Sequence, residues 1–256
     1  MSRKIVPGVD PRLLIRDAAK LLPQPSRRLF LRSAAGIGAL TLLSGCDIID
    51  GDTAEHALAR ISRFNDRVQA LLFDPNKLAP TYPESMVDRT FRFNAYYDED
   101  EAPEVDPATY KLEVGGLVDD KKSWTLAELY ALPQEKQITR HICIEGWSLI
   151  GSWTGARLSD FLKRIGADTR ARYVWFQCAD TYSTTIDMPT ALHPQTQMSF
   201  KFADQTLPRK FGFPMKIRIP TKLGFKNPKH VVAMNVTNKD LGGYWEDRGY
   251  NWFSGL

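Results

Sequence analysis

The residue best suited to metal chemistry is Cys143, which lies in the segment Arg140–Trp147 between two strand-like stretches rich in aromatic residues. A thiolate is a soft, strongly donating metal ligand, and a nearby cation such as Arg140 would favour its charged form. A single cysteine is also commonly a small, buried hydrophobic residue. These residue types alone leave both interpretations open.

Short strands and helices around Cys143 are predicted to position it. A capping box formed by Thr125 and Glu128 predicts a short helix before Pro133. Alternating apolar residues predict strands, and a helix followed by glycine is expected to end there. The predicted strands are 90–94, 110–114 (with a turn at the two glycines 115–116) and 172–178, and the predicted helix before Gly166 is 158–165.

A longer helix is predicted over residues 53–73, ended by Asp74 and Pro75. Its residues Leu58, Ile61, Val68 and Leu72 fall on one helical face. The simplest interpretation is that this face packs on the core and that the helix connects the N-terminal segment to the domain.

The segment Cys143–Ser148 reads Cys-Ile-Glu-Gly-Trp-Ser. It resembles the molybdenum-binding phrase Cys-Val-Glu-Ala-Trp-Ser of the sulfite oxidase superfamily, in the branch of the periplasmic methionine-sulfoxide reductase catalytic subunit. The resemblance extends over about residues 91–235. It implies an α+β fold of mixed sheets with flanking helices, and a molybdenum-molybdopterin cofactor whose metal is bound by Cys143.

The same resemblance implies two groups of cofactor contacts in the first half of the domain. Residues 93–98 are similar to the family's Asn-x-x-Tyr-Glu stretch, which assigns pterin contacts to Asn94, Tyr97 and Asp98, with Asp98 in the place of Glu. Cys178 aligns with a cofactor-contacting Thr. It can take that place, be a buried inert thiol, or form a disulfide with Cys143, which would remove the metal ligand.

A second segment, residues 211–230, resembles the family's Pro-Val-Arg strand followed by Gly-Phe-Lys. It implies cofactor contacts at Lys216, Gly224, Phe225, Lys226 and Lys229, with Lys226 holding the pterin phosphate. Lys216 stands where relatives have Arg, which keeps the charge but loses the planar fork. The alternative is that these lysines are solvated strand ends.

Two further phrases bear on the site. Phe211 departs from the family, in which sulfite oxidases have His and the reductase branch has Asn. His193 lies in a phrase similar to the family's Ala-x-His-Pro-x-Thr-x-Met, which predicts a loop near the site without a catalytic role.

Composition limits the possible classes of protein. The 256 residues, 43% of them hydrophobic, suffice for one large globular domain plus a tail. The formal net charge is +4, but residues 1–45 hold eight Lys and Arg against two Asp and Glu, which leaves 26 basic and 28 acidic residues in the remainder. This balance argues against a nucleic-acid surface.

The N-terminal 46 residues are predicted to be an export signal. Arg27 and Arg28 lie in a phrase that matches the twin-arginine consensus, followed by an apolar run, so the twin-arginine translocase is an expected partner. Cys46 ends a lipobox-like phrase, which predicts a lipid anchor at the periplasmic side of the bacterial inner membrane. A chance cysteine after an ordinary cleavage site is the alternative. The predicted organisation is a signal at 1–46, a helix and linker at 47–90, and a molybdopterin-binding domain at 91–256.

The predicted function is oxygen-atom transfer to or from a small-molecule substrate, most simply reduction of an S- or N-oxide. Sulfite oxidation is the first alternative, but Phe93 stands where sulfite oxidases have Arg. The second is a lipoprotein that keeps the fold without turnover. No haem-binding Cys-x-x-Cys-His phrase occurs, so a membrane or c-type cytochrome is the expected electron partner. Trp147 and the aromatic-rich segment 242–253 are expected to form the wall of the pocket; alternatively, that segment docks a partner.

Overall fold

The computed structural model describes residues 51–90 and 92–256, without the side chains of 51–55 and 57. The twin-arginine phrase and Cys46 therefore lie outside the described residues. Within the described part, residues Ala59–Leu256 form one compact unit. In that part, no helix has both the length and the apolar character that crossing a bilayer requires.

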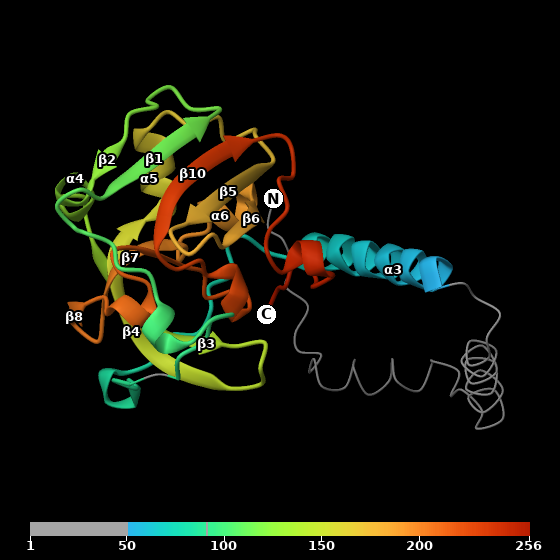
Figure 1. Cartoon of the computed structure of the whole chain (residues 1–256), viewed down its shortest axis with the longest axis horizontal. Helices are drawn as coiled ribbons and strands as arrows, with labels where there is room; N and C mark the ends of the chain where they lie inside the picture. The colour runs from blue at the N-terminus through green and yellow to red at the C-terminus, as the bar shows by residue number, and fades with distance from the viewer. Residues whose placement is uncertain (1–50, 91) are drawn as a thin grey trace, which may run out of the picture. The chain divides into compact units, whose positions relative to one another are not determined.

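The first sheet has five strands in the order β2-β1-β10-β5-β6. Only the β1 and β10 pair is parallel, and its neighbours pair antiparallel. Figure 1 shows β10, the orange-red strand near the end of the chain, between β1 and β5. The strands are β1 (Lys111–Gly116), β2 (Trp124–Thr125), β5 (Tyr173–Cys178), β6 (Ser183–Asp187) and β10 (Val231–Thr237).

The second sheet is antiparallel, in the order β3-β4-β7-β8, with β9 paired to β7. Its longest pairing is the hairpin of β3 and β4, whose strands lie side by side in Figure 1. The loop of this hairpin carries Cys143. The strands are β3 (Glu135–Ile142), β4 (Ser148–Arg157), β7 (Gln197–Phe202), β8 (Gln205–Thr206) and β9 (Lys216–Arg218).

The helices are few and mostly short. The Thr125–Glu128 capping box is present at the start of α4, and α5 ends before Gly166, whose φ of +62° is accessible to glycine at little cost. The α-helices are α3 (Gly51–Leu72), α4 (Leu126–Tyr130), α5 (Leu158–Arg164) and α6 (Met188–Leu192). The 3-10 turns are η1 (Glu84–Met86), η2 (Glu99–Glu101), η3 (Arg209–Phe211), η4 (Gly224–Lys226) and η5 (Glu246–Arg248).

One large core joins the two sheets. Apolar side chains of β1, β5 and β10 pack with those of α4, α5, β7 and β9, including Leu112, Phe161, Phe176, Phe200 and Ile217. Burial of this apolar surface is the main favourable contribution to folding. A smaller cluster around Trp153 and Phe202 lies in the second sheet, next to the β3–β4 hairpin.

Three predictions about local structure are wrong. Residues 92–94 form no strand, because Asn94 is committed instead to contacts with Cys143 and Lys229. The predicted core face of α3 is not in the core, since Leu58, Ile61 and Leu72 are each more than half exposed. The predicted Gly-Gly turn also differs, because both glycines still belong to β1.

Candidate functional site

Cys143 begins the five-residue loop that joins β3 to β4. Its amide donates to the Trp147 carbonyl over 2.9 Å, and its carbonyl accepts from the Gly146 amide over 3.2 Å. Gly146 has a φ of +88°, a backbone conformation that residues other than glycine rarely adopt. This tight loop turns the Cys143 thiol into a pocket, where only 4% of the residue is exposed.

The thiol has several hydrogen-bond donors around it. The side-chain amide of Asn94 lies 3.8 Å from the sulfur, and the backbone amides of Ile144 and Glu145 also donate to it. Burial and the charge of Glu145 raise the pKa of the thiol, while these three donors lower it. These donors point at the sulfur atom and favour its thiolate form, which is the form that binds a metal.

The cations that face the thiol are Lys216, at the start of β9, and Lys229, after η4. Both interact electrostatically with Cys143 and line its pocket. Burial, together with Lys229 and Arg218, holds the pKa of Lys216 well below its usual value, and burial lowers the pKa of Lys229 to about 8. The expectation that Arg140 is the neighbouring cation is wrong, because its guanidinium lies 5.6 Å from the Tyr82 ring centroid.

Gly224 brings a second segment directly against the Cys143 loop. A methyl group on Gly224 would lie 2.9 Å from Nε2 of His141 and 3.4 Å from Cα of Cys143. Only glycine allows the two backbones to approach so closely without displacement. Phe225, the next residue, also lines the pocket.

Aromatic rings form much of the remaining wall. Tyr96 stacks on Tyr244 with ring centroids 4.3 Å apart, and Tyr182 donates its hydroxyl to the Phe225 carbonyl over 2.6 Å. Trp245 and Tyr250 line the pocket as well. Of the two roles considered for the aromatic C-terminal segment, the structure supports a cover over the site.

Six of the predicted site residues meet in this pocket: Cys143, Asn94, Lys216, Gly224, Phe225 and Lys229. The others have different surroundings. The Tyr97 hydroxyl donates to Asp180 over 2.8 Å, and Asp98 is exposed at the start of η2. Cys178 is a buried free thiol in the main core, so it forms no disulfide with Cys143. The pterin contacts assigned to Tyr97, Asp98 and Cys178 stay predictions.

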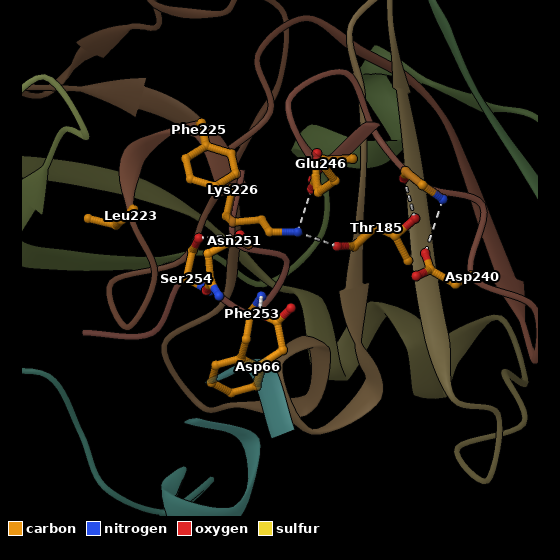
Figure 2. A network of polar contacts seen from close by, with 12 residues as sticks. Asp66, Thr185, Leu223, Phe225, Lys226, Asp240, Glu246, Asn251, Phe253 and Ser254 are labelled. Carbon is orange, nitrogen blue, oxygen red and sulfur yellow. Dashed lines mark hydrogen bonds and ion pairs between the residues drawn. The ribbon is translucent and has the colours of Figure 1, made fainter. Parts of the chain in front are cut away.

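Lys226 points away from the pocket wall. Figure 2 shows its ammonium group between Glu246 and Thr185; it forms an ion pair with the Glu246 carboxylate and donates to the Thr185 carbonyl over 2.9 Å. Trp252 covers it at 4.7 Å. The predicted contact between Lys226 and the pterin phosphate is not tested by this structure. Here the ammonium group of Lys226 is paired with the carboxylate of Glu246.

Two other residues lie elsewhere than expected. Trp147 is not among the described residues that line the pocket; its indole donates to Glu145 over 2.9 Å and packs against the smaller core cluster. His193 bonds to the Lys77 carbonyl over 3.1 Å and packs near Phe73. Neither residue contributes to the pocket wall.

The sequence interpretation missed Asp180, Tyr182 and Asn227 as pocket residues. Asp180 holds the Tyr97 hydroxyl, while the side-chain oxygen of Asn227 accepts from Arg218 over 2.8 Å and from the Ile219 amide over 2.7 Å. Asp180 follows β5 by two residues, so its position at a strand end was the available signal.

The pocket fits a negatively charged, metal-bearing cofactor. Cys143 presents a soft ligand atom flanked by donors, and the buried amino groups of Lys216 and Lys229 line the pocket beside it. A bound anion would favour the charged forms of both lysines. Molybdopterin combines anionic sulfur ligands with a phosphate, so these residues suit it.

Comparison with known proteins gives the same assignment. Residues 99–245 match the family described as the oxidoreductase molybdopterin binding domain. The chain belongs to this family. It is therefore a molybdopterin-dependent oxidoreductase, and the predicted family and enzyme class are confirmed.

Among similar proteins, the provisionally named protein-methionine-sulfoxide reductase subunit YedZ1 of Azospira oryzae is 59% identical over 94% of this chain and 92% of its own length. The protein-methionine-sulfoxide reductase catalytic subunit MsrP of Ralstonia nicotianae is 31% identical over 54% of this chain, and the protein of the same name from Xanthomonas axonopodis pv. citri is 30% identical over 57%. The matched part is 47% and 52% of these two relatives, respectively.

A solved structure shows the same fold. The sulfane dehydrogenase SoxCD of Paracoccus pantotrophus superposes with a TM-score of 0.52 at 18% identity, covering 55% of this chain and 41% of that one. At this identity the similarity concerns the fold alone. With one mixed sheet, one antiparallel sheet and short helices, this similarity confirms the predicted α+β class.

Proposed function

We propose that this oxidoreductase reduces sulfoxides, with methionine sulfoxide as the substrate class. The observation that carries the proposal is the aromatic wall of Tyr96, Tyr182, Phe225, Trp245 and Tyr250 around the Cys143 thiol. A sulfoxide such as methionine sulfoxide is a neutral, polarisable group with an apolar body, and aromatic rings bind such a body well. The names of the relatives support the same substrate class.

The pocket residues contribute to this activity in three ways. Cys143 would bind the metal through its sulfur, and Asn94 with the amides of Ile144 and Glu145 orients the thiolate. Lys216 and Lys229 offset the negative charge of the cofactor. When bound, the cofactor supplies the oxygen-atom transfer chemistry, while the aromatic residues hold the substrate and exclude water.

The electron source and the location form the second part of the proposal. Reduction of a sulfoxide to a thioether and water consumes an electron pair and protons, and we assign the delivery of electrons to a separate cytochrome. The twin-arginine phrase and Cys46 support export of the folded, loaded enzyme and its attachment at the periplasmic side of the inner membrane.

The reaction is tested with holoenzyme purified from a host that makes the cofactor. Molybdenum content is measured first, because a metal-free protein would favour the non-catalytic alternative. Reduction of methionine sulfoxide, dimethyl sulfoxide and trimethylamine oxide with a reduced dye is then compared with sulfite-dependent cytochrome reduction. We expect sulfoxide reduction to dominate. Fast sulfite oxidation without sulfoxide turnover would overturn the assigned direction and leave the family intact.

Location is tested by cell fractionation and by mass spectrometry of the mature N-terminus. We expect the membrane fraction to contain a chain that begins at Cys46 and carries acyl groups. Replacing Arg27 and Arg28 by Lys should retain the protein in the cytoplasm. Efficient export of that variant would refute the twin-arginine assignment, and an unmodified N-terminus after residue 46 would refute the lipid anchor.

A further inference from the structure

Most surface helices pack an apolar face against the protein, but α3 packs a polar face against it. Asp66 accepts a hydrogen bond from the Phe253 amide over 2.8 Å, and Gln69 accepts from the Gly255 amide over 3.0 Å. Ala59 and Ser62 lie on the same side and are also half-buried. This side of α3 is thus attached to the C-terminal segment by polar contacts.

The opposite side of α3 is apolar and exposed. Ile61, Phe64, Leu71 and Leu72, here called the outer face of α3, are 56%, 64%, 85% and 76% exposed, respectively. Their spacing places them on one helical face. A soluble protein rarely leaves several large apolar side chains contiguous in water unless that surface binds something.

The apolar surface continues beyond the end of the helix. Leu72, Leu78 and Leu256 line one open groove, and Leu78 and Leu256 are each more than half exposed. Lys77, Arg140 and Asp74 line the same groove. The exposed apolar surface is therefore accompanied there by two basic residues and one acidic residue.

Charge distinguishes the possible occupants. Arg60, Arg63 and Arg67 are exposed along one flank of the outer face. Asp66 is the only acidic residue of the segment 56–72, and it lies on the opposite side in contact with Phe253. The other acidic residues of α3, Asp52 and Glu55, lie in its first five residues. Parallel pairing of segment 56–72 with a second copy would bring two arginine rows together with no carboxylate from that segment facing them, whereas an anionic lipid surface complements them.

We propose that α3 lies in the surface of an anionic lipid bilayer, with its outer face inserted among the acyl chains. Basic flanks and a large aromatic residue such as Phe64 are typical of helices that bind in the interface plane. Cys46 precedes α3 by only a few residues, so a lipid anchor there would place the helix at the membrane. The inference does not depend on the reaction that the enzyme catalyses.

The test uses the chain from Asp47, loaded with cofactor, so that neither signal nor acyl chain contributes. This chain retains α3 and the whole compact unit Ala59–Leu256. Its cosedimentation is measured with vesicles of phosphatidylcholine alone or mixed with phosphatidylglycerol. We expect binding to the mixed vesicles that weakens as salt rises, since salt screens the arginine contribution.

Variants assign any binding to α3. Ile61→Glu combined with Phe64→Glu should weaken binding roughly tenfold or more, because it removes two inserted side chains. The matched control is Leu117→Glu with Leu241→Glu, two exposed leucines outside α3, which should bind like the wild type. Replacing Arg60, Arg63 and Arg67 by Gln should remove the preference for phosphatidylglycerol. Unchanged cofactor content and circular dichroism establish that each variant is folded.

Three outcomes would overturn the proposal. The first is no binding to either vesicle, or binding that the α3 variants do not change. The second is a concentration-dependent dimer that only the α3 variants abolish, which would assign the outer face to a second copy. The third is binding to native membranes but not to protein-free vesicles, which would assign it to a membrane protein.

Discussion

At the scale of single residues, the site depends on Cys143. Cys143→Ala should reduce turnover to background while leaving part of the cofactor bound, since other segments also contact the pocket. Cys178→Ala is compared with it, because its thiol is buried in the core and outside the pocket wall. Loss of molybdenum from that variant would support the predicted pterin contact of Cys178, and its retention would contradict it. Both variants are assayed for sulfoxide reduction and molybdenum content. Full activity in Cys143→Ala would exclude its role as the metal ligand.

Gly224 provides a second test at this scale. Gly224→Ala forces a methyl group against His141 and the Cys143 backbone, an overpacking that costs about 1–3 kcal/mol of unfolding free energy. Cofactor content and activity should fall as well, because the two segments separate. Gly115→Ala is the control, since its methyl would meet only Asn235 at 3.5 Å. Equal stability and activity of the two variants would contradict the close approach.

At the scale of elements, the buried Lys226–Glu246 pair joins η4 to η5. Lys226→Met leaves the Glu246 carboxylate buried without its cation, at a cost of about 3–5 kcal/mol. Lys226→Met with Glu246→Leu should recover much of this loss, because no charge is then left unpaired. Urea unfolding of the wild type, Lys226→Met, Glu246→Leu and the double variant completes a double-mutant cycle.

The same cycle tests the predicted phosphate contact of Lys226. The Lys226 ammonium faces Glu246 in Figure 2, so we expect the double variant to retain its molybdopterin. A stable double variant that loses the cofactor would instead support phosphate binding by Lys226. Measuring both unfolding and cofactor content separates the two roles.

The C-terminal segment supports the pocket as an element. Residues 221–223 pair with the end of the chain, through the Leu223 amide to the Ser254 carbonyl at 3.0 Å and the Leu256 amide to the Thr221 carbonyl at 3.1 Å. These residues lead directly into Gly224. The last residues of the chain therefore hold both the Gly224 loop and the aromatic cover in place.

At the scale of the whole molecule, Lys222 links three distant parts of the chain. Its ammonium group lies 2.9 Å from the Phe253 ring centroid and 5.2 Å from that of Phe73. Burial lowers the pKa of Lys222 to about 7. The unfolded chain, with a pKa near 10.4, binds more protons between pH 7 and 10.4. The free energy of unfolding should therefore rise with pH across this window.

Lys222→Met should reduce the rise in unfolding free energy with pH. It should also stabilise the protein at pH 7 and below, because the wild type buries a charged Lys222 in that range. The change is on the order of a few kcal/mol, at about 1.4 kcal/mol per unit of pKa difference. Lys229, with a pKa of about 8, contributes in the same direction, so part of the slope remains. The measurement is urea unfolding at several pH values. An unchanged slope in the variant would show that Lys222 does not titrate in this window.

The sequence by itself determined the family, the cofactor class and the local elements with strong signals. The Cys-Ile-Glu-Gly-Trp-Ser phrase predicted the metal ligand Cys143, and the Thr125–Glu128 capping box and Gly166 predicted where α4 begins and α5 ends. These features depend on residues close together in the chain. A capping hydrogen bond or a left-handed glycine is a local property that a sequence pattern expresses directly.

Only the tertiary structure decided which side chains face the pocket. Arg140 is three residues from Cys143 but lies over Tyr82, whereas Lys216 and Lys229 are far away in the chain and interact with its thiol. Lys226 lies within a segment that contributes to the pocket yet faces Glu246, and the apolar residues of α3 point outward because Asp66 and Gln69 bind the C-terminal segment. Hydrophobic periodicity defines which residues share a face, but packing between distant segments decides what that face contacts.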